Sequence, residues 1–174
     1  MSTVTIRKAH SGDEESIATV QILAWQMAYR EFMGIEFLNS LSVENKKMSW
    51  LNVLSNPSEK KCLIAEVHGG IQGFAVVGPA RDSDLDMCDC ELMALNVNPG
   101  HWRSKVGSSL ISAVFDSISK DNYLNIHLWV IKNNTPAIEL YKKFGFMESG
   151  VYKLDSSHTG NAVEEARYSL KLKN

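Results

Sequence analysis

Residues 91–110, ELMALNVNPGHWRSKVGSSL, join an apolar, β-rich run to a helical pattern through a short polar turn. A turn of this kind exposes backbone N–H groups at the helix start, where the helix dipole also favours negative charge. The segment can therefore bind a phosphate group. Gly107 would permit close approach of the backbone, and neighbouring side chains can add hydrogen bonds or positive charge, namely Arg103, Ser104, Lys105, Ser108 and Ser109. The alternative is that residues 98–100 form only a turn and that Gly107 packs the helix against its neighbour.

Residues 128–146, LWVIKNNTPAIELYKKFGF, repeat the order of strand, turn and helix. Thr135 is expected to cap this helix, Pro136 suits its first position, and Gly145 suits the chain reversal that follows its last turn. The segment therefore predicts a short helix after an apolar strand.

Together, the two segments resemble the GCN5-related N-acetyltransferase (GNAT) superfamily, and the resemblance in the order of elements covers nearly the whole chain. The family block L-x-V…N-x-x-A-x-x-x-Y-x-x-x-G-F is matched at Leu128, Val130, Asn134, Ala137, Tyr141, Gly145 and Phe146. The block V-x-P…R/Q-x-x-G-x-G/A is matched at Val97, Pro99 and Gly107. The resemblance implies an acyl-CoA N-acyltransferase that uses acetyl-CoA as a co-substrate and needs no metal.

The resemblance also implies roles for single residues. Asn134 would hydrogen-bond the pantetheine arm of acetyl-CoA, Tyr141 would protonate the departing CoA thiolate, and residues 95–97 would offer main-chain hydrogen bonds to the pantetheine. The residues implied in cofactor binding are Leu95, Asn96, Val97, Trp102, Arg103, Ser104, Lys105, Val106, Gly107, Ser108, Ser109, Asn134, Ala137 and Tyr141.

Two residues depart from the family pattern in the diphosphate loop. Trp102 stands where the family often has Arg or Gln, and Lys105 stands where it usually has its first glycine. A Cβ at Lys105 could crowd the diphosphate, or the ammonium group could pair with it.

A primary amine attacks a thioester only in its neutral form, yet a free alkylamine with a pKa of about 10.4 is mostly charged at neutral pH. A carboxylate can take the proton, directly or through a water. Glu91 is the candidate general base, since it opens the strand beside the expected acyl site and resembles the position of the catalytic glutamate in histone-acetylating members of the family. The alternatives are that Glu91 is a solvated residue at a strand end, and that a chain of waters replaces a single base.

By resemblance, the acceptor lies against residues 25–41, the loop 81–89 and the closing strands. Aromatic residues of the first segment could line an acceptor groove or belong to the core, namely Trp25, Tyr29, Phe32 and Phe37. The loop carries Asp82, Asp84, Asp86 and Asp89, which could attract a cationic acceptor such as a polyamine or a lysine-containing peptide, or could simply be solvated. For His127, which has no visible partner in its strand pattern, a structural role is expected.

The elements expected around these segments alternate along the chain. Strands are predicted at residues 3–7, 62–67, 71–77, 91–97, 126–131, 146–152 and 164–172, and helices at residues 13–32, 42–56, 103–120 and 136–144. The order β-αα-βββ-α-β-α-ββ predicts an α/β fold with a mixed sheet. The resemblance implies a mostly antiparallel sheet of about seven strands, with central parallel strands that splay apart.

Composition limits the remaining possibilities. With 174 residues, of which 44% are hydrophobic, the chain can bury one sizeable core, and we expect one N-acetyltransferase domain over residues 1–174. The net charge of -2 suggests neither a nucleic acid nor a membrane partner, and no apolar run is long enough to span a bilayer. The three cysteines, Cys62, Cys88 and Cys90, suggest neither a disulfide framework nor a zinc site, which favours the cytoplasm.

The predicted function is transfer of an acetyl group from acetyl-CoA to a primary amine of a small molecule, a polyamine, or a protein or peptide, by direct attack in a ternary complex. A non-catalytic acyl-CoA-binding or interaction module of the same fold is the alternative, and release of thiol from acetyl-CoA would separate the two. A Rossmann-type nucleotide protein fits less well, because the loop near Gly107 lacks the G-x-G-x-x-G pattern. Family members often form homodimers, and no feature of this sequence decides the oligomeric state.

Overall fold

The computed structural model describes residues 3–56, 58–156 and 162–172. Its elements, in chain order, are β1 (Val4–Lys8), α1 (Glu14–Ala28), α2 (Ile35–Ser40), α3 (Val43–Ser55), β2 (Lys61–Val67), β3 (Gly70–Pro79), β4 (Asp89–Val97), the 3-10 helix η1 (Pro99–His101), α4 (Val106–Ile118), β5 (Asn125–Ile131), α5 (Thr135–Lys143), β6 (Met147–Asp155) and β7 (Val163–Lys171). Within these residues, no helix is both long enough and apolar enough to cross a bilayer.

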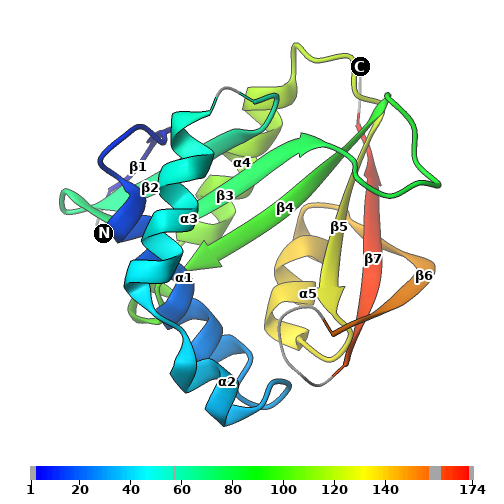
Figure 1. Cartoon of the computed structure of the whole chain (residues 1–174). Coiled ribbons are helices and arrows are strands. Elements are labelled where there is room, and N and C mark those ends of the chain that lie inside the picture. Colours follow the sequence, from blue (N-terminus) through cyan, green and yellow to red (C-terminus); the bar gives the residue numbers. More distant parts are fainter. Residues whose placement is uncertain (1–2, 57, 157–161, 173–174) are drawn as a thin grey trace.

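The strands form one seven-stranded sheet in the order β1-β2-β3-β4-β5-β7-β6 (Figure 1). Neighbouring strands are antiparallel except for β4 and β5, which run parallel in the middle of the sheet. The predicted mixed, mostly antiparallel α/β fold is therefore confirmed.

The two parallel strands are paired over only a short length. Their register runs from the pair Asp89–Asn125 to the pair Glu91–His127. After Glu91, β4 is paired with β3 alone among the described strands, and Figure 1 shows β4 and β5 diverging from their common end. The predicted splay is thus present, and it begins at Glu91.

A bulge in β4 lies just beyond this point. Val77 pairs with Leu92 and Val76 pairs with Ala94, so that Met93 is an extra residue on β4. Such a bulge bends its strand and increases the local twist. It therefore helps to turn β4 away from β5.

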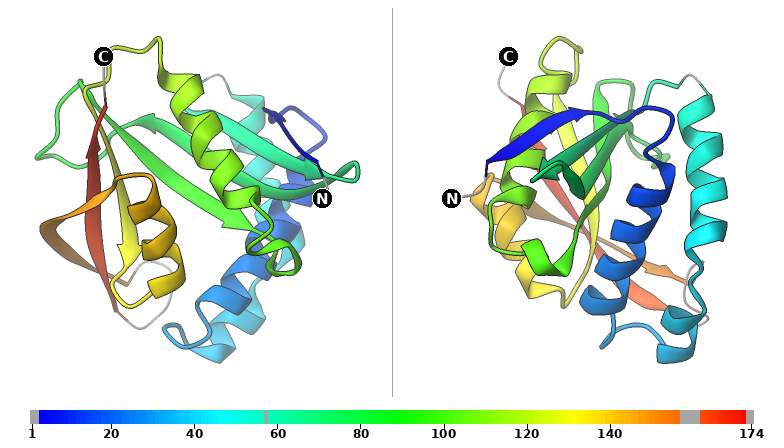
Figure 2. Two further views of the ribbon diagram at one scale, coloured as in Figure 1. Left: turned by 180° about the vertical axis from the view of Figure 1, so that it is seen from behind. Right: turned by 90° about the vertical axis from the view of Figure 1, so that its left-hand side faces the viewer.

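Helices cover both faces of the sheet. α1 and α3 pack on one face, while α4 and α5 lie on the other (Figure 2). The largest group of buried apolar side chains fills the space between the sheet and α4 and α5, and a second group lies under α1 and α3. A third group joins the end of α1 and α2 to Ile131 on β5 and Val163 on β7. The gap between β4 and β5 therefore lies between two packed layers.

The helices differ from the predicted ones in four respects. α1 ends at Ala28 and not at residue 32, because Tyr29 has left the helical conformation. α4 begins at Val106 and not at residue 103, because Arg103 and Lys105 have φ angles of 60° and 69° and cannot continue a right-handed helix. Asn134, and not Thr135, caps α5. α2 has six residues, too few to produce a helical repeat in the sequence.

Candidate active site

The start of α4 presents unpaired backbone donors. The first hydrogen bond within this helix runs from the Ser109 N–H to the Lys105 carbonyl oxygen at 2.9 Å. The N–H groups of Val106, Gly107 and Ser108 therefore have no acceptor within the helix, and the positive end of the helix dipole lies beside them. This arrangement can bind a diphosphate.

The loop before α4 is held by side-chain hydrogen bonds. The Trp102 indole N–H donates to the Val97 carbonyl at 2.8 Å, and the Ser104 hydroxyl donates to the His101 carbonyl. Trp102 thus fixes the end of β4 and does not supply the cation that the family often has at its position. Lys105 is exposed and adopts a left-handed conformation with φ of 69°, which glycine adopts at lower cost. The usual glycine of the family fits this conformation.

Gly107 brings α4 close to α5. A Cβ at Gly107 would lie 3.1 Å from the Leu140 Cδ2 and 3.8 Å from the Val97 Cγ2. The first of these distances is shorter than an ordinary van der Waals contact, so the Leu140 side chain would have to shift by a few tenths of an ångström to admit a Cβ. Gly107 therefore packs the helix against its neighbour, and its N–H remains one of the donors described above.

The beginning of α5 lies on the other side of the gap. The Asn134 Oδ1 accepts a hydrogen bond from the Ala137 N–H at 3.5 Å, and the Asn134 carbonyl accepts one from Ile138 at 3.0 Å. With its oxygen facing the helix, the Asn134 amide keeps two N–H donors for another partner. Ala137 packs against the apolar core below α5.

Tyr141 points from α5 into the protein. Its side chain is 8% exposed and meets Phe146 edge to face, with 6.0 Å between ring centroids. Burial raises the pKa of Tyr141 well above its ordinary value, with a smaller contribution from Tyr29. A neutral phenol at this position is a hydrogen-bond donor at physiological pH.

Glu91 is buried, with 3% of its surface exposed, which excludes the interpretation as a solvated residue at a strand end. The Arg81 guanidinium holds both of its carboxylate oxygens, at 2.9 Å from Nε and 2.5 Å from Nη2. This bond, against the opposing effect of burial, raises the pKa of Arg81. Each oxygen of Glu91 retains a further lone pair, so the paired carboxylate can still accept a proton or a water.

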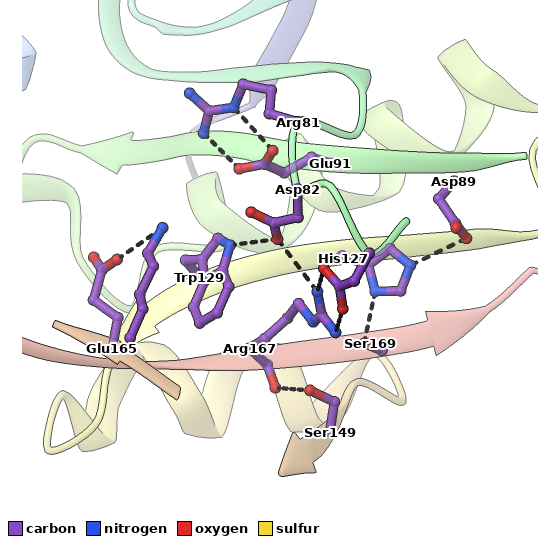
Figure 3. A network of polar contacts seen from close by, with 12 residues as sticks. Arg81, Asp82, Asp89, Glu91, His127, Trp129, Ser149, Glu165, Arg167 and Ser169 are labelled. Carbon is purple, nitrogen blue, oxygen red and sulfur yellow. Dashed lines mark hydrogen bonds and ion pairs between the residues drawn. The ribbon is translucent and has the colours of Figure 1, made fainter. Parts of the chain in front are cut away.

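Polar side chains cover the same face of β5 and β7 beside Glu91 (Figure 3). His127 is buried, and its ring nitrogens lie 3.2 Å from Asp89 Oδ1 and 2.7 Å from Ser169 Oγ. The expected structural role of His127 fits this arrangement. The Asp89 pKa is lowered because hydrogen bonds to its carboxylate outweigh the effect of burial, which is the largest single contribution and acts in the opposite direction.

Arg167 forms the second part of this polar face. Its guanidinium donates to both carboxylate oxygens of Asp84, at 2.9 and 2.6 Å, and to Asp82 at 3.4 Å. Asp82 also accepts the indole N–H of Trp129 at 2.9 Å. Figure 3 shows Asp82 between Trp129 and Arg167.

The acidic loop is therefore bonded within the chain. Asp82 and Asp84 hold Arg167, Asp89 accepts from Asn125 at 2.8 Å, and Asp86 accepts from the Cys88 N–H at 2.7 Å. All four carboxylates have partners, which leaves less negative charge for a cationic acceptor than the sequence suggests.

The aromatic residues of the first helical segment form a cluster. Trp25 and Tyr29 meet edge to face at 5.6 Å, and these two residues pack with Phe32 and Phe37 against Met33, Leu38, Ile131 and Val163. Burial raises the pKa of Tyr29 to about 12, with a smaller contribution from the charge of Glu165. Trp25 is thus part of a packed cluster, whereas Tyr29 lies close enough to Tyr141 to influence its pKa.

The structure places most of the predicted residues on the elements that border the gap between β4 and β5, whereas Trp102, Arg103, Ser104 and Lys105 lie exposed in the loop before α4. Sequence reasoning missed Arg81 and Arg167. For Arg167, the available signal was its position between Ala166 and Tyr168 in the last predicted strand. Within the described ranges, no three His, Cys, Asp or Glu side chains are grouped so as to hold a metal ion.

Comparison with known proteins agrees with this geometry. Residues 21–146 match the model of the family described as Acetyltransferase (GNAT) family. YuaI of Bacillus subtilis (strain 168), an uncharacterized N-acetyltransferase, is 30% identical over 142 residues, which cover 81% of this chain and 79% of that protein. The L-amino acid N-acetyltransferase AaaT of Escherichia coli (strain K12) is 29% identical, with 99% of this chain and 100% of that protein covered. The fold is similar to that of the PaiA N-acetyltransferase of Thermoplasma acidophilum in complex with coenzyme A, with a TM-score of 0.79, 21% identity, and 98% of this chain and 99% of that chain covered.

Proposed function

The chain belongs to the GNAT family of acetyltransferases, and from this membership we propose that it transfers an acetyl group from acetyl-CoA to a primary amine by direct attack in a ternary complex. The observation that carries the proposal is the parting of β4 and β5 after Glu91, with the donors of α4 beside it and α5 beyond it. Residues 1–174 would act as one N-acetyltransferase domain.

The residues around the gap fit acetyl-CoA. The diphosphate would lie on the N–H groups of Val106, Gly107 and Ser108, with Lys105 adding a positive charge. The pantetheine would lie along residues 95–97 of β4, whose backbone has no partner on β5 among the described residues, and would accept a hydrogen bond from Asn134. The PaiA N-acetyltransferase, which has this fold, was crystallised in complex with coenzyme A, and this supports acetyl-CoA as the co-substrate.

The reaction needs one proton acceptor and one proton donor. The amine nitrogen attacks the thioester carbonyl carbon, and the tetrahedral intermediate then breaks its C–S bond and releases the CoA thiolate. The amine enters this step neutral, after its ammonium form has given one proton to water through the base. Its nitrogen becomes positively charged on attack and gives a second proton to the base, and the thiolate takes a proton from the acid. The net reaction of an alkylammonium ion with acetyl-CoA yields the amide, coenzyme A and one proton released to water.

Glu91 would act as the base, directly or through a water. Its ion pair with Arg81, with contacts of 2.9 and 2.5 Å, holds the carboxylate at the point where the strands part. A positioned carboxylate can accept the proton as the amine attacks. The ion pair thus gives Arg81 an orienting role.

Tyr141 would act as the acid. Its raised pKa keeps the phenol protonated, and the phenol can donate a hydrogen bond to the thiolate as negative charge develops on sulfur. An ordinary thiol has a pKa of about 8.5, which is below the pKa of Tyr141. Burial of the CoA thiolate in the site would raise the thiol pKa too, and this would favour transfer of the proton from Tyr141 to sulfur.

The proposed acceptor is a primary amine of a small molecule, a polyamine, or a protein or peptide. The name of AaaT, an L-amino acid N-acetyltransferase of nearly the same length, favours a small molecule. We place the reaction in the cytoplasm, in keeping with three cysteines that are all free.

Thiol release from acetyl-CoA in the presence of a panel of amines tests this proposal. We expect release that depends on the amine, together with an acetylated product identified by its mass. Binding of acetyl-CoA without thiol release for any amine would instead indicate a non-catalytic module.

A further inference from the structure

Arg167 is an arginine with an incomplete set of partners. Its side chain is 7% exposed, and its Nε is buried without a hydrogen-bond acceptor among the described residues. A buried polar group without a partner costs free energy. Arg167 therefore has more donor groups than its partners among the described residues use.

The partners of Arg167 differ in how firmly they are held. Asp82 is partly buried, with 26% of its side chain exposed, and it also accepts the Trp129 indole N–H. The Asp84 side chain is 57% exposed, and among the described residues its side-chain hydrogen bonds are to Arg167. The carboxylate of a ligand could therefore take the place of the Asp84 carboxylate on the Arg167 guanidinium, and the charge beside the guanidinium would stay the same.

Arg167 lies beside the opening of the sheet. In the register, Glu91 pairs with His127, and Arg167 pairs with Trp129, two residues further in the direction in which β4 and β5 part. Two residues correspond to about 7 Å along a strand, and Arg167 is two strands from Glu91, or about 10 Å across. Side chains at alternating positions of a strand share a face, so Glu91, Trp129 and Arg167 face the same side. A small molecule can reach from one group to the other.

We propose that the acceptor is an α-amino acid whose carboxylate replaces that of Asp84 on Arg167, so that its amine lies at the gap near Glu91. This inference rests on the proposed function and specifies its acceptor. A bidentate arginine recognises a planar carboxylate, and the Nη1 and Nη2 groups that now hold Asp84 would hold the carboxylate of the acceptor in the same way. A polyamine carries no carboxylate to replace Asp84, and the amine of a peptide lysine side chain is far from any carboxylate of its own residue.

Matched acceptors test the proposal on the unmodified protein. Standard L-amino acids are each compared with their α-carboxamides, and kcat/KM is expressed per neutral amine, because the amide has the lower amine pKa. We expect kcat/KM to be about tenfold or more higher for the acids, as loss of a hydrogen-bonded charge costs about 1.5–3 kcal/mol. Equal or faster transfer to the amides would overturn the inference and leave the proposed function intact. No transfer to any amine would overturn both.

Two variants make the assignment specific to Arg167. Asp84→Asn removes the competing carboxylate and should lower KM for the acids but not for the amides, whereas Asp86→Asn on the same loop should change neither. Arg167→Gln should remove the preference for the acids while transfer to the amides persists. If Arg167→Gln fails to fold, Asp84→Asn still tests the proposal. An unchanged KM for the acids in Asp84→Asn would contradict replacement of the Asp84 carboxylate by that of the acceptor.

Discussion

Glu91 on β4 and His127 on β5 form the last pair of the two parallel strands, and both side chains are held on one face of the sheet. Glu91 is fixed by Arg81, and His127 by Asp89 and Ser169. The place where the sheet opens is therefore supported by polar contacts on one face and by the apolar core on the other. This support fixes the position of the candidate base at the point where the two strands part.

Replacement of Tyr141 by Phe should lower kcat by about 10²-fold with little change in KM for acetyl-CoA, because it removes only the proton donor. The ring can remain against Phe146, so the melting temperature should change little. The measurement is steady-state thiol release. Tyr152→Phe is the control, since Tyr152 lies on exposed β6, and equal activity in the two variants would remove Tyr141 from the mechanism.

Replacement of Glu91 by Gln should lower kcat by about 10²-fold or more, because the amide cannot accept the amine proton. The variant keeps an oxygen for Arg81 and so retains most of the local geometry. Glu66→Gln is a matched control, since Glu66 also pairs with an arginine, Arg7, but on β2. A kcat close to that of the wild type would show that water alone takes the proton.

Lys105 combines backbone strain with a useful charge. Lys105→Gly should relieve about 1 kcal/mol of left-handed strain, offset in part by the greater entropy of the unfolded chain. Lys105→Ala keeps the strain and loses the same charge. Both variants should raise KM for acetyl-CoA at low salt by a similar factor, and Lys105→Gly should be the more stable in urea. A larger KM effect for one variant than the other would contradict the assignment of that effect to charge.

The ion pair of Arg7 and Asp13 should make stability depend on pH. Arg7 donates to both oxygens of Asp13, at 2.8 and 2.9 Å, and this bond lowers the Asp13 pKa in the folded state. A lowered folded pKa gives stability that is present above the unfolded pKa of about 3.9 and is lost as pH falls through the folded value. The free energy of unfolding in urea should therefore fall more between about pH 7 and about pH 3 for the wild type than for Asp13→Asn. The same difference in both proteins would contradict the prediction.

Local patterns in the sequence predicted the order of strands and helices and the two strand-to-helix turns. The predicted start of α4 was wrong because nothing in the amino-acid sequence indicates that Arg103 and Lys105 adopt left-handed conformations. Thr135 and Asn134 are both good capping residues, and only the backbone decides between them. The contacts of Arg167 with Asp82 and Asp84 join residues more than eighty positions apart, which no periodicity reveals.

Hydrogen exchange of the backbone amides with and without acetyl-CoA tests the central claim most directly. We expect acetyl-CoA to slow exchange in residues 95–97 of β4 and residues 106–108 of α4, since those amides in the two segments that do not already bond within the protein would gain hydrogen bonds to the pantetheine and the diphosphate. Exchange in α3 should stay the same. Unchanged exchange in both segments at saturating acetyl-CoA, or protection confined to another part of the chain, would contradict the placement of the co-substrate between β4 and β5.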